Sequence, residues 1–200
     1  MTAAAILTGG QARRFHGLDK SGLVVAGRTI LEHQLERLAP GAADIMIVTS
    51  QARVADFPTS RLPRGVRVVF DRYPGSGPLG AVMTAIEAAS GAPVLVLAAD
   101  MPHVSARLLS ALTALHDNEP PSHDATVPHS ARGPEPLCAI YAPSALPALR
   151  AALASGDLSL RHALDRLRVR VMASGAVAAV GAPGRLFRIL NSPDELWLYH

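Results

Sequence analysis

The chain is almost without lysine: Lys20 is the single lysine among 19 basic side chains, and the other 18 are arginines. This makes the position of Lys20 informative, because an ammonium is a compact charge on a flexible stem, whereas a guanidinium is a planar fork. Lys20 closes a loop that contains Gly9-Gly10 and follows the first strand-like run. We interpret Lys20 as a ligand of phosphate oxygens; the alternative is that it falls there by chance.

Cysteine and aromatic residues are also scarce. A single cysteine, Cys138, excludes an internal disulfide and a cysteine-rich metal site. It lies within an apolar strand pattern, which predicts packing and not a nucleophile. Aromatics make up 4% of the chain and the arginines are scattered, so a nucleic-acid partner is not expected despite the net charge of +3. A small phosphorylated ligand fits this modest charge better.

Long apolar runs are absent as well. No run approaches the roughly 20 residues needed to cross a bilayer, so no membrane span is expected. The run Ala3–Leu7 lacks a basic leader and a cleavage site, which argues against a signal peptide. We therefore expect a cytoplasmic protein, and 200 residues with 49% apolar content predict one domain with a sizeable core.

Strand-like and helical patterns alternate along the first part of the chain. Short aliphatic runs bounded by turn residues predict buried parallel strands at Ala3–Leu7, Asp44–Thr49, Val66–Phe70 and Pro93–Ala98. Apolar residues at three- and four-residue spacing predict helices at Thr29–Leu38, Leu79–Ala89 and Ser105–Leu115. This alternation predicts an α/β fold: an open, mostly parallel Rossmann-like sheet flanked by helices on both faces, in three α/β/α layers.

The second part of the chain is less regular. Residues 116–133 are polar, with two adjacent prolines and three histidines, and predict an exposed connection. The spacing of His116, His123 and His129 matches no closed zinc site. Further elements are expected as strands at Leu137–Tyr141 and Val169–Ala173, helices near Ala145–Ala154 and Leu160–Leu167, and a last helix from about Pro193.

The residues just after each strand are the first candidates for a binding site, because open α/β sheets bind ligands outside the carboxyl ends of their strands. These residues are the loop from Thr8 to Lys20, Thr49–Gln51, Asp71 and Asp100. Asp100, beside a proline-fixed turn, suits a hard cation such as Mg²⁺. A helix-capping or turn role is equally open for Asp100, and likewise for Asp71.

Two glycine-rich turns point to an anionic ligand. Gly9-Gly10 allows close backbone approach and an anion-binding nest, to which Arg13, Arg14 and Lys20 add positive charge. The Walker A and dinucleotide-binding patterns are both absent. The second turn, from Gly75 to Gly80, leads into a helix whose N-terminus can face an anion or a base.

The first loop, Leu7 to Lys20, resembles the Leu-Ala-Gly-Gly-x-Ser/Ala-x-Arg-Met-Gly-x-Asp-Lys signature of the MobA family, the molybdenum cofactor guanylyltransferases. Further blocks follow in the family's order and cover nearly the whole chain. They are Asp71, Gly77-Pro78-Leu79-Gly80, Ala99-Asp100-Met101-Pro102, Glu135 to Tyr141, and Asn191 to Leu196.

The resemblance implies a fold of the nucleotide-diphospho-sugar transferase type and Mg²⁺-dependent transfer of GMP from GTP to a molybdopterin-type cofactor. It implies a single domain over 1–200, with a nucleotide-binding part at about 1–115 and an acceptor-binding part at about 124–200. Partners implied besides GTP and the cofactor are a molybdopterin-insertion protein and molybdoenzyme chaperones. Catalytic roles fall on Lys20, Asp100 and Arg14, with Asp100 also as metal ligand, and Asn191 lies toward the pterin. The implied nucleotide-binding set is Leu7, Thr8, Gly9, Gly10, Lys20, Thr49, Asp71, Gly77, Pro78, Leu79 and Asp100.

Some residues depart from the family pattern. Thr8 replaces an alanine, Phe15-His16 replaces Met-Gly, and Thr49 stands where a polar amide is frequent. A cytidylyltransferase, an enzyme for a different phosphorylated acceptor and a non-catalytic cofactor carrier therefore stay open as alternatives. Gly9-Gly10 favours guanine, because the cytidylyl relatives resemble Leu-Ala-Ala-Gly at this place.

Overall fold

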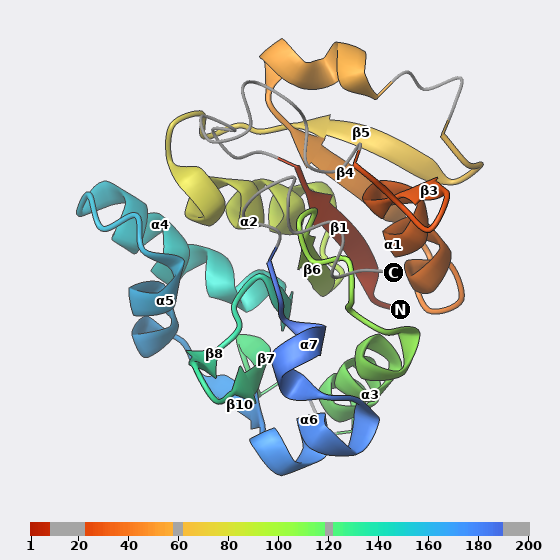
Figure 1. Ribbon diagram of the computed structural model, residues 1–200. Coiled ribbons are helices and arrows are strands. Elements are labelled where there is room, and N and C mark those ends of the chain that lie inside the picture. The colour runs from red at the N-terminus through yellow and green to blue at the C-terminus, as the bar shows by residue number, and fades with distance from the viewer. Residues whose placement is uncertain (9–22, 58–61, 119–121, 190–200) are drawn as a thin grey trace.

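A single sheet runs through both parts of the chain in the computed structural model, which describes residues 1–8, 23–57, 62–118 and 122–189 (Figure 1). Its strands lie in the order β10-β7-β9-β6-β1-β4-β5, and β8 pairs with β7. The strands are β1 (Ala3–Leu7), β4 (Ile45–Thr49), β5 (Val66–Phe70), β6 (Val94–Ala98), β7 (Ala125–Ser130), β8 (Gly133–Pro134), β9 (Cys138–Tyr141) and β10 (Val169–Met172). Two further short strands, β2 (Val24–Val25) and β3 (Arg28–Thr29), form a separate ribbon.

The four strands expected in the first part are all present and parallel. β1 pairs with β4 and β6, and β4 pairs with β5. β9 is antiparallel to both β6 and β7. The connection from β7 to β9 is too short for the crossover that a parallel pairing needs, so β9 returns in the opposite direction. The prediction of a mostly parallel sheet is confirmed.

Alternate residues of the central strand β1 face two separate cores. Ala3, Ala5 and Leu7 pack into a cluster with α2 (Gly77–Ala88), α4 (Leu146–Ala154) and α5 (Leu160–Ala163). Ala4 and Ile6 pack on the other face with α1 (Ile30–Leu38), α3 (Ala106–Asp117), α6 (Ser174–Val180) and α7 (Pro183–Leu186). Because side chains alternate along a strand, one strand contributes to both cores. The predicted three-layer α/β/α arrangement is therefore confirmed (Figure 1).

Local signals explain where two of the helices begin. Thr29 caps α1 in a reciprocal capping box with Glu32, and the Ser105 hydroxyl accepts the Leu108 N–H at 3.2 Å at the start of α3. Short 3₁₀ turns occur at Gln51–Asp56, Pro143–Ala145 and Leu164–Arg166, the last of which ends the helix expected over 160–167. None of the helices within the described residues is long and apolar enough to span a membrane.

The prediction of an exposed connection over residues 116–133 is wrong. This segment contains the end of α3 and the sheet strand β7, whose residues Ala125 and Val127 are fully buried. The polar residues that suggested a flap are paired inside the fold: Thr126 bonds His116, and Asp124 bonds Arg168. Helices α6 and α7 were also not expected. The helix expected from about Pro193 lies outside the described residues.

Candidate functional site

The carboxyl ends of four parallel strands meet along one edge of the sheet. Leu7 is in register with Val48 on one side and Ala98 on the other, and Thr49 is in register with Phe70. Backbone bonds extend this alignment beyond the strands. Thr8 N–H donates to Val48 O at 2.9 Å, Asp71 N–H to Thr49 O at 2.8 Å, and Ala99 N–H to Leu7 O at 3.0 Å. The segments that carry Thr8, Thr49, Asp71 and Asp100 therefore lie side by side.

This edge includes the point where the strand order reverses. The chain goes from β1 outward to β4 and β5, and then returns to β6 on the opposite side of β1. In open α/β sheets the crevice at such a switch point is where ligands bind. The residues that follow β1 and β6 lie on either side of this switch point, and their role as site residues stays a prediction.

Thr8 offers its backbone to this edge and not its side chain. Its hydroxyl donates to Val48 O at 3.0 Å, and both Leu7 and Thr8 are buried. Its carbonyl accepts a hydrogen bond from Arg53 Nη1 at 2.5 Å, and Arg53 Nε bonds Asp56 at 3.2 Å. Sequence reasoning missed Arg53. The only available signal was its place in the turn that follows β4.

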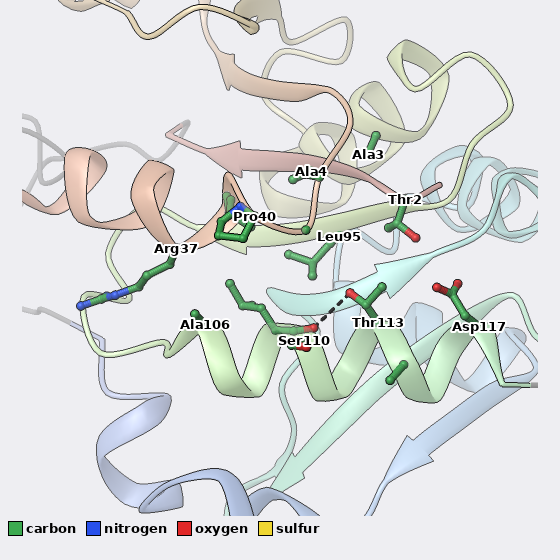
Figure 2. Close-up of a pocket in the computed structure, with 15 residues that line it drawn as sticks. Thr2, Ala3, Ala4, Arg37, Pro40, Leu95, Ala106, Ser110, Thr113 and Asp117 are labelled. Carbon is green, nitrogen blue, oxygen red and sulfur yellow. Dashed lines mark hydrogen bonds between the residues drawn. The ribbon is translucent and has the colours of Figure 1, made fainter.

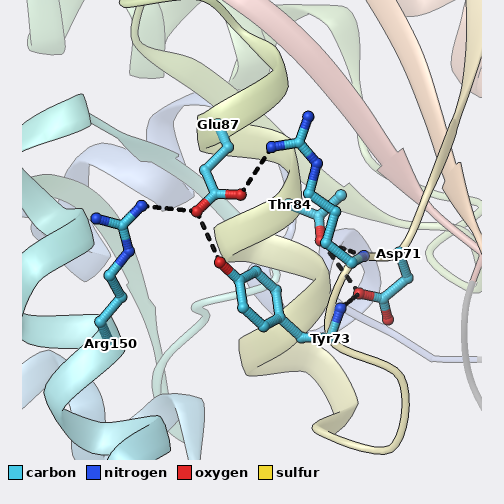
Figure 3. A network of polar contacts seen from close by, with 6 residues as sticks. Asp71, Tyr73, Thr84, Glu87 and Arg150 are labelled. Carbon is cyan, nitrogen blue, oxygen red and sulfur yellow. Dashed lines mark hydrogen bonds and ion pairs between the residues drawn. The ribbon is translucent and has the colours of Figure 1, made fainter.

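Asp71 is fixed by the helix beneath it (Figure 3). Its Oδ1 accepts hydrogen bonds from the Tyr73 N–H at 2.9 Å and from the Thr84 hydroxyl at 3.1 Å. Thr84 lies on α2, is fully buried, and also accepts the Arg72 N–H at 3.0 Å. Both bonds to Asp71 use Oδ1, so Oδ2 remains outside this network. Sequence reasoning did not identify Thr84.

Glu87 lies on α2 one turn after Thr84, and its carboxylate binds the side chains of the two residues that follow Asp71. Its Oε1 accepts from the Tyr73 hydroxyl at 2.7 Å and from Arg150 at 2.8 Å, while Oε2 accepts from Arg72 at 3.1 Å (Figure 3). Burial raises the pKa of Glu87, but the hydrogen bonds from Arg150, Tyr73 and Arg72 outweigh it and bring the pKa below its ordinary value. The network joins the 71–73 segment to both α2 and α4.

Asp100 lies in a turn whose backbone carbonyls accept hydrogen bonds from side chains of α1. The Met101 N–H donates to Ala98 O at 3.3 Å and closes the turn. Gln34 Nε2 donates to Ala98 O at 2.8 Å and to Met101 O at 3.2 Å, and Arg37 Nη1 donates to Pro102 O at 2.5 Å. Asp100 itself is half-buried at the carboxyl edge.

The donor set at this edge fits one kind of metal site. No group of three or more His, Cys, Asp or Glu side chains is placed to hold a metal ion within the described part of the chain. Mg²⁺ does not need such a cage, because it commonly takes one or two carboxylates and completes its shell with waters and substrate phosphates. A carboxylate such as Asp100 therefore suits an ion that is shared with a phosphorylated substrate.

The glycines of the second glycine-rich turn have two different structural roles. Gly75 and Gly77 have φ of +85° and +59°, a region in which side chains are strained. A Cβ on Gly80 would lie 2.8 Å from both Cβ and O of Tyr73. Leu79 is completely buried, so only its backbone can reach a ligand, and Ser76 makes no side-chain cap at the start of α2.

Other predicted residues are either buried or lie outside the described part of the chain. Thr49 is completely buried, and its hydroxyl has no hydrogen-bond partner among the described residues. Gly9, Gly10, Arg14, Lys20 and Asn191 lie outside the described residues. The packing prediction for Cys138 is confirmed: the residue is buried, which raises the pKa of its thiol to about 12.

Two histidines of the described residues have pKa values below the ordinary one. His116 donates or accepts one bond with the Thr126 hydroxyl at 2.9 Å, and burial lowers its pKa. His103, beyond the Asp100 turn, has its pKa lowered to about 4 by burial and by the charges of Arg185, Arg37 and Arg188.

A cavity of about 420 Å³ lies between α1 and α3, away from this edge (Figure 2). Thr2, Ala3 and Ala4 at the start of β1 line it, whereas the candidate site lies beyond the end of β1. Its walls are mainly apolar, and the single cation among the described residues that line it, Arg37, donates to Pro102 O.

A three-layer α/β/α sheet with carboxylates beyond its switch point is characteristic of nucleotide-binding α/β proteins. Comparison with known proteins gives the particular family. The chain belongs to the family of the MobA-like NTP transferase domain, whose model matches residues 4–171.

Individual relatives agree with this assignment. The chain is 34% identical to a probable molybdenum cofactor guanylyltransferase of Chloroflexus aggregans, over 99% of this chain and 93% of the relative. Among solved structures it is similar to molybdopterin-guanine dinucleotide biosynthesis protein A from Archaeoglobus fulgidus, with a TM-score of 0.81, 27% identity, and coverage of 99% and 96% of the two chains. A cytidylyltransferase from Thermus thermophilus acting on 2-C-methyl-D-erythritol 4-phosphate shares the fold, with a TM-score of 0.63, 20% identity, and coverage of 100% and 97%.

Proposed function

We propose that the protein transfers GMP from GTP to the terminal phosphate of the molybdenum-molybdopterin cofactor, which yields the guanine dinucleotide cofactor and pyrophosphate. The observation that carries this proposal is the pair of carboxylates, Asp71 and Asp100, each braced at the same sheet edge on either side of the switch point. The names of the relatives from Chloroflexus aggregans and Archaeoglobus fulgidus support the choice of guanine and of molybdopterin.

The proposed binding roles come from the family resemblance, and the shared sheet edge of Thr8, Thr49, Asp71 and Asp100 supports them. The backbone at Leu7, Thr8, Gly9 and Gly10 contacts the nucleotide, and the Asp71 carboxylate accepts hydrogen bonds from the guanosine end. Gly77, Pro78 and Leu79 contribute backbone at the start of α2, and Thr49 lies beneath the base. The nucleotide occupies the part at about 1–115. The acceptor occupies the part at about 124–200, with Asn191 toward the pterin.

The reaction itself requires positioning and charge neutralisation, not a covalent nucleophile. An oxygen of the acceptor's terminal phosphate attacks the α-phosphorus of GTP. The bond from that phosphorus to the bridging oxygen of the β-phosphate breaks, and pyrophosphate leaves with the electron pair. Lys20 and Arg14 neutralise the charge that develops on the phosphates during this step.

We assign Mg²⁺ to Asp100. A bound Mg²⁺ supplies Lewis-acid stabilisation of the phosphate oxygens. Asp100 would hold the ion, and the turn from Ala98 to Pro102 that carries this carboxylate is fixed by its own Met101 N–H and by Gln34. The product passes to a molybdopterin-insertion protein or to molybdoenzyme chaperones.

The proposal is tested by incubating the protein with molybdopterin cofactor, Mg²⁺ and each nucleoside triphosphate in turn. We expect pyrophosphate release and dinucleotide formation with GTP alone. Turnover with CTP alone would show a cytidylyltransferase instead. Tight cofactor binding without turnover of any triphosphate would favour a carrier.

A further inference from the structure

Helix α1 carries a glutamine at a core position. Gln34 is completely buried, between the apolar residues Ile30 and Leu38 of the same helix. Burying an amide in a core is unfavourable unless its polar atoms find partners. Only the nitrogen of Gln34 does so, because its Oε1 is buried without a hydrogen-bond partner among the described residues. An apolar side chain would fill this position without that penalty.

The amide nitrogen of Gln34 spans the two ends of the Asp100 turn. It donates to Ala98 O, the last residue of β6, at 2.8 Å and to Met101 O at 3.2 Å. The Met101 N–H also donates to Ala98 O, so Asp100 is the third residue of a turn whose first and fourth carbonyls share one donor. One side chain therefore sets the separation of the two carbonyls on either side of Asp100.

A second residue of α1 continues this attachment. Arg37, three residues after Gln34 on the same helix face, donates to Pro102 O at 2.5 Å. Residues 98–102 therefore accept hydrogen bonds from α1 side chains at three carbonyls. Asp100, within this segment, is half-buried at the carboxyl edge.

We propose that Gln34 is a positioning residue that holds the Asp100 carboxylate in place for a divalent cation shared with the nucleotide. The role of Asp100 in this inference rests on the proposed function. Gln34 acts through the backbone of the turn and touches neither substrate nor ion. Partners that orient a metal ligand typically change metal affinity or activity by about 10- to 100-fold when they are removed.

The test compares Gln34→Met with the wild-type protein, because methionine keeps the length and volume of the side chain but has no donor. GTP is titrated by calorimetry with and without Mn²⁺. We expect the affinity for GTP alone to be unchanged and the gain in affinity that Mn²⁺ brings to fall by about 10- to 100-fold. Gln34→Glu should lose at least as much, because a carboxylate oxygen would face the two carbonyls. Asp100→Asn gives the reference value for loss of the ligand itself.

A second measurement does not depend on ligand binding. Hydrogen exchange of the Met101 amide should accelerate by about fivefold or more in Gln34→Met, while exchange elsewhere in β1 and β6 stays slow. Thr126→Val is the matched control, since it also removes a buried side-chain hydrogen bond but lies on β7, away from the turn. It should leave both readouts at their wild-type values.

The possible outcomes separate this inference from the proposed function. Wild-type Mn²⁺ dependence and wild-type exchange at Met101 in Gln34→Met would show that Gln34 only fills space, and would overturn the inference. Equal acceleration of exchange throughout the core would do the same, because it indicates a general loss of stability. If the wild-type protein shows no Mn²⁺ effect and no GTP turnover, the proposed function fails, and the exchange of Met101 alone decides whether Gln34 holds the turn.

Discussion

The Thr84 hydroxyl donates a hydrogen bond to Asp71 Oδ1 across 3.1 Å while it accepts the Arg72 N–H at 3.0 Å. Thr84 thus connects α2 to the segment after β5 and fixes the rotamer of Asp71. Without this hydroxyl, Asp71 Oδ1 keeps the Tyr73 N–H as its hydrogen-bond donor within the described part of the chain. The geometry of Asp71 at the carboxyl edge of the sheet should therefore depend on Thr84, which is fully buried.

Thr84→Val tests this dependence, because valine has nearly the shape of threonine without its hydroxyl. We expect the KM for GTP to rise by about fivefold, corresponding to one lost hydrogen bond of about 1 kcal/mol, with a smaller change in kcat. Thr84→Ser, which keeps the hydroxyl, should restore most of the loss. Steady-state kinetics with GTP varied provide the measurement; equal KM values in the valine and serine variants would contradict the positioning role.

Asp124 should contribute to stability at neutral pH. Its carboxylate, largely buried, accepts hydrogen bonds from the Arg168 side chain and N–H and from Ser144, which together hold its pKa well below the ordinary value despite desolvation. A lowered folded-state pKa stabilises the fold above the pKa of the unfolded chain, and this contribution declines progressively as the pH falls below about 5.

Asp124→Asn should therefore lower the free energy of unfolding by about 2 kcal/mol at pH 7 and flatten its decline toward acid pH. Urea unfolding at a series of pH values measures both effects. Asp165→Asn, at an exposed position of the turn before β10, is the control and should change neither. Parallel pH curves for wild-type protein and Asp124→Asn would refute the assignment.

Gly80 should not tolerate even one methyl group. A Cβ at this position would lie 2.8 Å from the Cβ and O of Tyr73, which is bonded to Asp71 through its N–H. Gly80→Ala should lower the free energy of unfolding by about 1–3 kcal/mol and raise the KM for GTP, because Tyr73 must move.

Gly175→Ala is the matched control for this change. Gly175 lies in α6, where an added Cβ would meet nothing within 4 Å among the described residues, so alanine should stabilise the helix by about 0.5–1 kcal/mol. Thermal and urea unfolding of both variants test the contrast. Similar stability changes in the two would show that the contact with Tyr73 is not limiting.

The sequence indicates the parts of the fold whose signal is local. β1, β4, β5 and β6 are recognised because each is an aliphatic run bounded by turn residues. β7 is missed because its polar residues resemble a loop until their partners are known: Asp124 pairs with Arg168, 44 positions away. A polar residue can be buried only if it finds a hydrogen-bond partner, and a partner far away in the sequence cannot be read from a local pattern.

The same distinction applies to the candidate site. The shared edge of Asp71 and Asp100 can be predicted because both residues follow parallel strands whose carboxyl ends lie at one edge. Thr84, Gln34 and Arg53 cannot, because their importance rests on contacts with residues 13, 64 and 45 positions away. Positioning residues of this kind become visible only when the fold brings the two segments together.

The lone lysine gives the last prediction. Lys20 lies outside the described residues, so its assignment as a phosphate ligand depends on the loop that follows β1 and on the family resemblance. If the ammonium binds phosphate oxygens in the crevice, Lys20→Ala should lower kcat by about 100-fold or more. Lys20→Arg keeps the charge but brings a planar fork where a compact group fits, so kcat should fall by about tenfold.

The control is Arg107→Lys, the reverse substitution at an exposed position of α3 away from the site, which should leave kcat unchanged. Turnover of GTP by the three variants under saturating Mg²⁺ provides the measurement, and wild-type kcat in Lys20→Arg would mean that only the charge, and not the ammonium, is required.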